Sequence, residues 1–260
     1  MIVRLLTYNI REGGIGRAEQ IAEVIKAARP DVVALQEARD PNVVERIARL
    51  AEFPFCGSRV AHSTGFLSRV PVLEYAWRHP PRTRHALLEV RLGDGSPRVF
   101  VLHLRAWFSK WTEHRRASEL RGLLAGIQDQ LVREEHAFAF HVLAGDFNAL
   151  APGEHFDSSP MPAWIRGMIW LSGRDIARTT IETMRANAYV DAWRAVHSDS
   201  EKDPGYTFPV WNPHVRLDYA FIPAAYASRV VACEVCTTPD VARTASDHYP
   251  LLVELTHDLR

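Results

Sequence analysis

The chain of 260 residues carries 31 Lys and Arg against 31 Asp and Glu, and 47% of its residues are hydrophobic. This composition is typical of a globular protein and excludes collagen-like, coiled-coil and disordered chains. The net charge of zero disfavours a dedicated nucleic-acid binder, although a local basic patch would still allow an enzyme to act on nucleic acid. Three cysteines do not form a disulfide framework, and no apolar run could span a bilayer, so we expect a cytoplasmic protein.

The first fifty residues alternate strand and helix patterns. The apolar segment Ile2–Tyr8 predicts a strand rather than a signal peptide, because a charged residue interrupts it and no cleavage site follows. Apolar residues at helical spacing predict a helix over Arg17–Arg29, which the next residue, a proline, would end. The continuous run Asp31–Gln36 predicts a buried strand, and a second helix is expected at Asn42–Ala51.

From about Phe53 the pattern changes to consecutive short strands. These are expected at Gly65–Ser68, Val70–His79, His85–Leu92 and Val99–Leu104. A long amphipathic helix should follow over Trp111–Arg133, and then a buried strand over Ala139–Ala144. Residues 150–187 are expected to be irregular and then helical. Three closing strands are expected at Arg216–Ile222, Arg229–Cys236 and Leu251–Leu255.

Two similar halves mix helices with consecutive antiparallel strands. This pattern predicts an α/β (α+β) architecture in which two sheets pack face to face with helices outside. Neither a linker nor a fixed-period repeat divides the chain, so we expect one domain over residues 1–260, and a monomer.

Polar residues repeatedly stand at the ends of the apolar strands. They are Asn9, Glu37, His103, Asp146, Asn148, Asp218, Asp247 and His248. Burying such a group is costly unless a partner or a metal compensates, and strand ends are where α/β sheets place functional groups. Any one of them could be a cap or a turn residue, but the whole set predicts a common site.

The residue types fit one kind of reaction. Asn9, Glu37 and Asp247 offer hard oxygen ligands, which suit Mg²⁺ or Mn²⁺ and not zinc. Histidines and further carboxylates supply acid and base near neutral pH. Asp146 and Asn148 would share one face of an extended segment, so that one accepts a proton from water while the other donates to an oxyanion. Metal-assisted attack of water on a phosphoester needs these parts.

Seven short segments add a more specific signal. They are Thr7–Ile10, Leu35–Glu37, Phe66–Arg69, Leu102–Leu104, Gly145–Ala149, Arg216–Tyr219 and Ser246–His248. In this order the set resembles the endonuclease/exonuclease/phosphatase superfamily, which has the DNase I-like fold, and it covers essentially the whole chain. The resemblance implies a four-layer α/β sandwich, with two packed mixed β-sheets flanked by helices and the site at one edge of both sheets.

The resemblance also implies a metal site and a water-activating carboxylate. Glu37 would be the principal Mg²⁺ ligand, with Asn9 and Asp247 beside it. Asp146 would orient or deprotonate the attacking water, and Asn148 would hold a phosphoryl oxygen.

Two histidines would flank the phosphate in such a site. His248, oriented by Asp218, would bind the scissile phosphate or act as acid or base, and His103 would contact the phosphate from the other side. In some members of the superfamily a carboxylate orients this second histidine, and Glu74 is a candidate for that role here.

The hypothesis that follows is a Mg²⁺- or Mn²⁺-dependent phosphoric ester hydrolase of the phosphodiesterase or phosphatase type. Abasic-site endonucleases of the superfamily usually place Tyr where this chain has His103, so a nuclease or DNA-repair enzyme ranks lower. A phospholipid or sphingomyelin phosphodiesterase acting at a membrane surface is another alternative. A non-catalytic module that only binds phosphate is the last.

The loop that follows His103 interleaves aromatic and cationic residues over Arg105–Trp111. Arg105 and Trp107 are therefore candidates for substrate binding, through a phosphate group, a stacked base or a membrane surface. An equally strong interpretation is a helix-entry loop whose tryptophans pack on the core.

Other segments carry weaker signals. The apolar segment Pro160–Leu171 is expected to be a helix that covers the core rather than a substrate lid, and Tyr206–Pro213 is expected at the rim of the site. Arg82, Arg84 and the pair Arg115–Arg116 are expected to be ordinary solvated cations.

Overall fold

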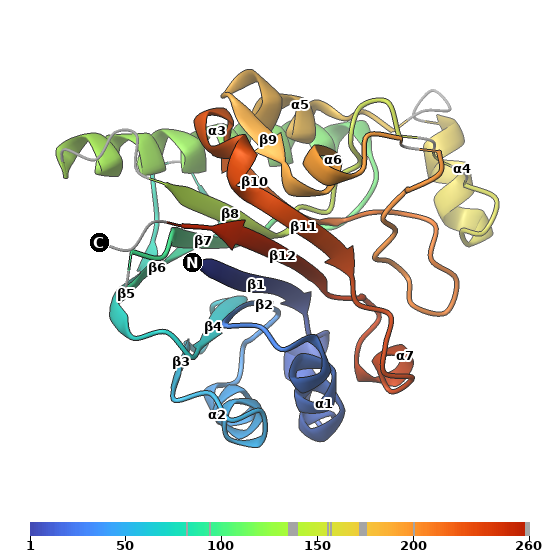
Figure 1. Ribbon diagram of the computed structural model, residues 1–260. Coiled ribbons are helices and arrows are strands. Elements are labelled where there is room, and N and C mark those ends of the chain that lie inside the picture. Colours follow the sequence, from blue (N-terminus) through green and yellow to red (C-terminus); the bar gives the residue numbers. More distant parts are fainter. Residues whose placement is uncertain are drawn as a thin grey trace.

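Two six-stranded β-sheets lie face to face at the centre of the molecule, with helices on both outer sides (Figure 1). The structure is a computed structural model. It describes residues 1–81, 83–93, 95–134, 140–154, 156, 158–171, 176–199 and 201–257, without the side chains of 168, 169 and 171.

The first sheet has the strand order β11-β12-β1-β2-β4-β3. Its strands are β1 (Ile2–Asn9), β2 (Val32–Gln36), β3 (Phe55–Ser58), β4 (Thr64–Ser68), β11 (Val230–Val235) and β12 (Leu251–Thr256). β1 runs parallel to β2 and antiparallel to β12, so the two ends of the chain meet in the middle of this sheet.

The second sheet has the order β5-β6-β7-β8-β10-β9. Its strands are β5 (Val72–Arg78), β6 (Leu87–Leu92), β7 (Arg98–His103), β8 (His141–Asp146), β9 (Tyr189–Asp191) and β10 (Asp218–Pro223). β7 and β8 are parallel, whereas β8 and β10 are antiparallel.

Helices form the two outer layers. α1 (Ala18–Ala28) and α2 (Pro41–Leu50) cover the first sheet, and α3 (Lys110–Arg133) and α5 (Thr179–Ala186) cover the second. The remaining elements are α4 (Ala163–Leu171), α6 (Ala192–Val196), α7 (Ala242–Ala245) and the 3-10 turns η1 (Glu12–Gly14) and η2 (Ala224–Arg229). The arrangement is the predicted four-layer α/β sandwich.

Side-chain alternation along the strands divides the core into layers. In β1, Val3 and Leu5 face the second sheet, while Leu6 and Tyr8 pack under α1 and α2. This is the period of two that an extended strand imposes. The inward-facing residues of each strand therefore form a row that packs between the two sheets. The last residue of such a row lies at the end of the strand, at one edge of this shared core.

Most predicted elements are present, with shifted ends. The short edge strands β3 and β9 and the short helices α6 and α7 were not predicted, because each is too short to show a clear period. The predicted strand over 139–144 is β8, which begins at His141, and Ala139 lies outside the described residues, as does Arg82. None of the described helices has both the length and the apolar character needed to cross a membrane.

One prediction about α3 is wrong. Arg116 is not solvated: it is fully buried, and its guanidinium donates to Glu113 and to the carbonyl oxygens of Arg105 and Trp107. Its neighbour Arg115 lies over the ring of Trp111. A buried guanidinium here satisfies loop carbonyls that would otherwise lack partners.

Candidate active site

Three adjacent strands of the second sheet end in the predicted site residues. Asp146 of β8 is paired in register with His103 of β7 on one side and with Asp218 of β10 on the other. Each of these side chains ends the inward-facing row of its strand, because Val101, Ala144 and Ala220, two residues away, lie in the core between the sheets. The three groups therefore point into the space between the two sheets.

The first sheet supplies Asn9 by the same rule. Asn9 ends the inward row of β1, and its Nδ2 donates to Asp146 Oδ2 across the sheets at 3.0 Å. Gly145 lets β8 lie close to β7: it has φ +155°, and a Cβ there would lie 1.9 Å from the carbonyl oxygen of Leu102. Sequence positions 137 residues apart are thus joined by one hydrogen bond at the centre of the site.

Asp146 is a buried carboxylate that lies beside both histidines of this centre. It is 1% exposed, and its Oδ1 accepts a hydrogen bond from the backbone N–H of Asn148 at 2.8 Å. Burial raises the pKa of Asp146 to about 7, and the negative charge of Asp218 adds to this, while the charge of His248 opposes it. A carboxylate whose pKa lies near neutrality is suited to accept a proton from water.

Asn148 approaches Asp146 in a way that the sequence argument did not anticipate. The chain is not extended at Asn148, which has a left-handed φ of +49°. The prediction that Asp146 and Asn148 share one face of an extended segment is therefore wrong. Instead, the Asp146 carboxylate accepts the N–H two residues ahead, and Asn148 Nδ2 donates to Leu104 O at 3.1 Å. Asn tolerates this backbone conformation better than most residues. Phe147 points into the core, as predicted.

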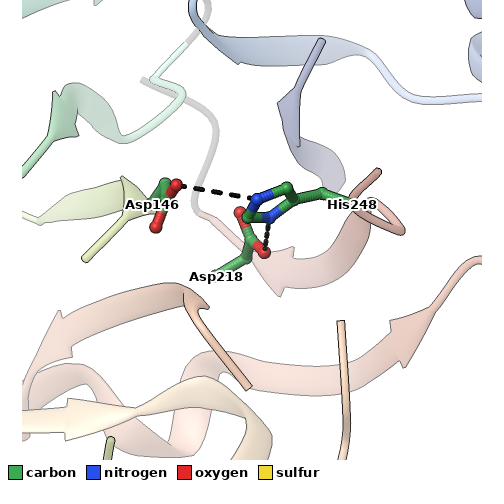
Figure 2. A group of neighbouring side chains, drawn as sticks. All are labelled: Asp146, Asp218 and His248. Carbon is green, nitrogen blue, oxygen red and sulfur yellow. Dashed lines mark hydrogen bonds and ion pairs between the residues drawn. The ribbon is translucent and has the colours of Figure 1, made fainter. Parts of the chain in front are cut away.

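His248 and Asp218 form a buried pair beside Asp146 (Figure 2). His248 Nδ1 lies 2.8 Å from Asp218 Oδ2, and its Nε2 lies 3.9 Å from Asp146 Oδ2. Burial alone would lower the pKa of His248, but the adjacent Asp218 carboxylate outweighs it and raises the pKa to about 10. The ring of Phe208, from the predicted rim segment Tyr206–Pro213, packs against His248 at 4.8 Å.

His103 has a different charge state. Its Nε2 lies 3.7 Å from Asp146 Oδ2, and burial lowers its pKa to about 4. The imidazole is therefore neutral near pH 7. Glu74 does not orient it: this carboxylate lies on the exposed strand β5 and pairs with Arg78 and Arg91. β5 is an edge strand separated from β7 by β6, which places Glu74 too far from the site.

The three predicted metal ligands lie on the first-sheet side. Glu37 directly follows β2 with a left-handed φ of +59°, and its Oε2 accepts the N–H of Glu12 at 2.6 Å. Asn9 Oδ1 accepts the N–H of Arg11 at 3.0 Å, and Asp247 Oδ2 lies 3.8 Å from Arg11 Nε. The charge of Glu37 acts on His103 and that of Asp247 acts on His248, so both carboxylates lie near the centre.

This donor set fits a hard divalent cation. All three residues offer carboxylate or amide oxygens, and Glu37 Oε1 accepts no hydrogen bond from the described residues. The tightest group of possible ligand atoms in the described chain is a different one, comprising Asp146, Asp218 and His248 within 4.8 Å of one another. Because Asp218 already accepts a hydrogen bond from the imidazole, we interpret that group as acid–base machinery.

A pocket of about 790 Å³ opens beside Glu37 and His103. Arg105 and Trp107 line it, as their predicted role in substrate binding requires. Five further residues line the pocket that sequence reasoning did not assign to the site: Arg39, His62, His79, Arg84 and His85. They lie on three loops, between β2 and α2, β3 and β4, and β5 and β6, without any periodic pattern, so only the folded chain shows that they converge. We call this the basic pocket.

α4 forms part of the rim next to the basic pocket. Its Ile165 packs on a small apolar cluster that includes Leu150 and Leu217, which agrees with a core-covering helix. Its Trp164 is 54% exposed, however, and lies 5.5 Å from Trp107, itself 56% exposed. Two indoles therefore form an open aromatic surface at the mouth of the pocket.

Comparisons with known proteins agree with this architecture. A sequence model of the endonuclease/exonuclease/phosphatase family matches residues 6–248. An AP endonuclease from Archaeoglobus fulgidus superposes with a TM-score of 0.71 at 19% identity, covering 99% of this chain and 100% of that one. The 3′ phosphatase NExo from Neisseria, bound to product DNA hairpin, gives 0.68 at 17% identity, with coverage of 98% and 99%.

A third structure, an endonuclease/exonuclease/phosphatase from Beutenbergia cavernae, gives a TM-score of 0.69 at 22% identity and covers 98% of this chain and 72% of that one. No curated protein matches the chain by sequence. At these identities the structural similarity establishes the fold.

Proposed function

Because the chain belongs to the endonuclease/exonuclease/phosphatase family, we propose that it is a divalent-metal-dependent hydrolase of phosphoesters, of the phosphodiesterase or phosphatase type. The observation that carries this proposal is the environment of Asp146. This buried carboxylate, with its pKa near 7, lies between a neutral histidine and a charged one and opposite a set of oxygen ligands.

Glu37, Asn9 and Asp247 would hold the cation, with Mg²⁺ or Mn²⁺ as the candidates. When bound, such a cation neutralises charge on the phosphate and lowers the barrier to attack by water. The remaining groups of the site belong to the chain itself and can be assigned from their hydrogen bonds.

Asp146 would orient the attacking water and accept its proton. Asn9 and the N–H of Asn148 hold the Asp146 carboxylate in place through its two oxygens. His248, positively charged through Asp218, would face the developing negative charge with Nε2 and then protonate the leaving oxygen. His103, which is neutral, would donate a hydrogen bond to the phosphate from the other side.

The test is hydrolysis of p-nitrophenyl phosphate and bis(p-nitrophenyl) phosphate. Turnover is expected with Mg²⁺ or Mn²⁺, should stop with EDTA and should return when the cation is restored. Asp146→Asn and His248→Ala should each lower kcat by a factor of roughly 10²–10⁴, the range for loss of a general base or acid. Asp199→Asn is the matched control, because Asp199 lies on the surface and pairs with Lys202.

Two outcomes would contradict the proposal. Full turnover in Asp146→Asn would remove the assigned base. A wild-type protein that binds phosphate but hydrolyses no monoester or diester would instead support a non-catalytic binding module.

A second candidate is a nuclease or DNA-repair enzyme. The exposed pair of Trp107 and Trp164 favours it, because open indoles can stack on bases. Incubation with supercoiled plasmid, abasic duplex and single strands distinguishes the two candidates. Nicking that depends on Trp107 and Trp164 would favour the nuclease. The absence of nicking at any metal concentration would exclude the nuclease function. A phospholipid or sphingomyelin substrate at a membrane surface would show itself by co-sedimentation with liposomes.

A further inference from the structure

The basic pocket holds more positive charge than one scissile phosphate needs. Three arginines line it, Arg39, Arg84 and Arg105, and among the described lining residues Glu37 is the one acid. No hydrogen bond or ion pair engages these three guanidinium groups within the described part of the chain. Unpaired guanidinium groups that converge on a pocket are suited to bind a phosphate, because their planar fork matches its oxygens.

The walls of this pocket are fixed by buried charges on α3. Glu119, 9% exposed, accepts the backbone N–H groups of Arg84 and His85 at 2.8 and 2.7 Å through a single oxygen. Arg116, fully buried, donates to the carbonyls of Arg105 and Trp107 at 2.7 and 3.0 Å. Both arginine-bearing loops are therefore held at their backbones while their side chains remain available to a ligand.

Histidines extend the polar lining of this pocket away from the catalytic centre. His62, His79 and His85 line the same pocket, and the rings of His62 and His79 lie 5.6 Å apart. The pocket thus runs from Glu37 and His103, beside the catalytic centre, to a second group made of arginine and histidine side chains.

We propose that the basic pocket binds a second phosphate group of the same substrate molecule, so that the preferred substrate is a small organic molecule with two phosphate groups. This inference rests on the proposed function for the first phosphate. A compact substrate is favoured because three arginines gather in one pocket on a chain of zero net charge, whereas proteins that bind polynucleotides usually carry a basic excess.

Binding of inorganic pyrophosphate in EDTA tests the pocket without catalysis. Without metal, the carboxylates of the catalytic centre repel phosphate, so calorimetric binding reports on the basic pocket. Arg39→Gln, Arg84→Gln and Arg105→Gln should each weaken binding about tenfold, the loss expected for one charge-assisted contact. Arg49→Gln is the control, because Arg49 is an exposed arginine of α2 that does not line this pocket. Absent binding, or equal binding by all variants, would overturn the proposal.

Kinetics then test the substrate class. With Mg²⁺, the KM for adenosine 3′,5′-bisphosphate should be at least tenfold lower than that for adenosine 5′-monophosphate. Arg84→Gln should raise the KM of the bisphosphate by a larger factor than the KM of the monophosphate. Equal KM values for the two nucleotides would overturn the assignment. A thymidine tetranucleotide is the competing ligand in a displacement assay. The assignment would also be overturned if the tetranucleotide displaced pyrophosphate with higher affinity than the bisphosphate and if the three arginine variants weakened both ligands equally.

The two proposals fail in different ways. A protein that hydrolyses no ester but binds pyrophosphate through these arginines would refute the enzyme and keep the second phosphate site. A metal-dependent hydrolase whose pyrophosphate binding ignores the arginines would do the reverse.

Discussion

Asp218→Asn tests whether one buried carboxylate sets the charge of His248. Asp218 is fully buried, and its Oδ2 lies 2.8 Å from His248 Nδ1, while the other imidazole nitrogen faces Asp146. Asn has nearly the same shape but no negative charge. The substitution therefore removes the electrostatic contribution of Asp218 and leaves the packing around His248 in place.

The size of that contribution follows from the pKa of His248. Its rise from 6.5 to about 10 corresponds to about 5 kcal/mol in favour of the imidazolium, since each pH unit is worth about 1.4 kcal/mol. Asp146 and Asp247 supply part of it, so the pKa in the variant should fall by two units or more rather than drop to its buried, unpaired value. The imidazole should then be neutral at pH 8.5, and kcat should fall by a factor of roughly 10²–10⁴.

The same pair makes stability depend on pH. A histidine whose folded pKa is raised contributes stability that is fully present below pH 6.5 and is lost as the pH rises through about 10. The wild type should therefore lose free energy of unfolding over that interval. Asp218→Asn should lose much less, because the pKa of its histidine lies closer to the value of 6.5 in the unfolded chain.

The assay is an NMR titration of the His248 imidazole in metal-free protein, together with urea unfolding at pH 6.5 and pH 10. Asp199→Asn serves again as the surface control. An unchanged pKa of His248 in Asp218→Asn would refute the electrostatic reasoning. Unchanged kcat alongside a lowered pKa would refute the catalytic role of the imidazolium but not the pair itself.

Three further predictions concern single residues. Glu37→Gln should weaken Mg²⁺ binding in calorimetry by roughly 10–100-fold with an unchanged circular dichroism spectrum, and equal affinity would place the cation elsewhere. Because the pKa of Asp146 is raised to about 7, hydrolysis should fall as the pH drops below that value, and a pH–rate profile flat to pH 5 would exclude Asp146 as the base. Gly145→Ala should destabilise the fold by ~3 kcal/mol or more in urea unfolding, because its Cβ would overlap Leu102 O. Gly16→Ala, with φ +73° and open space around it, should lose only ~1 kcal/mol, and equal losses would contradict the steric argument.

The layered fold could be predicted because its central strands are long and apolar. β2 and the middle of β8 are continuous hydrophobic runs, and β1 is mostly apolar apart from Arg4 and Thr7, which is typical of strands buried on both faces. β3 was missed because its sequence, Phe-Cys-Gly-Ser, has neither an apolar run nor a clear alternation. It becomes a strand only because β4 offers it a free edge to pair with.

The catalytic centre could be predicted for the same physical reason as the strands. A polar residue that ends the inward-facing row of an apolar strand must lie between the sheets at the end of that strand. Asn9, Asp146 and Asp218 all lie at such positions. The same rule does not apply to Glu74, because β5 is an exposed edge strand whose charged side chains pair with arginines on the surface. The sequence therefore could not show whether Glu74 lies near His103.

The residues of the basic pocket could not be assigned to the site from the sequence, because they follow no periodic pattern. Its arginines lie on loops, where side-chain direction has no period, and the backbones of the loops that carry Arg84 and Arg105 are held by a row of buried charges on α3. Glu113, Arg116 and Glu119 recur every third residue and so lie along one helix face. Two of them hold pocket loops, and Glu113 holds Arg116 and also accepts the N–H of Thr180 in α5. Removing the side chain of Arg116 or of Glu113 would leave the other one buried without its ionic partner, at a cost of about 3–5 kcal/mol. The loops of Arg84 and Arg105 are therefore held by the helical layer, whereas His103, Asp146 and Asp218 stand at the ends of strands.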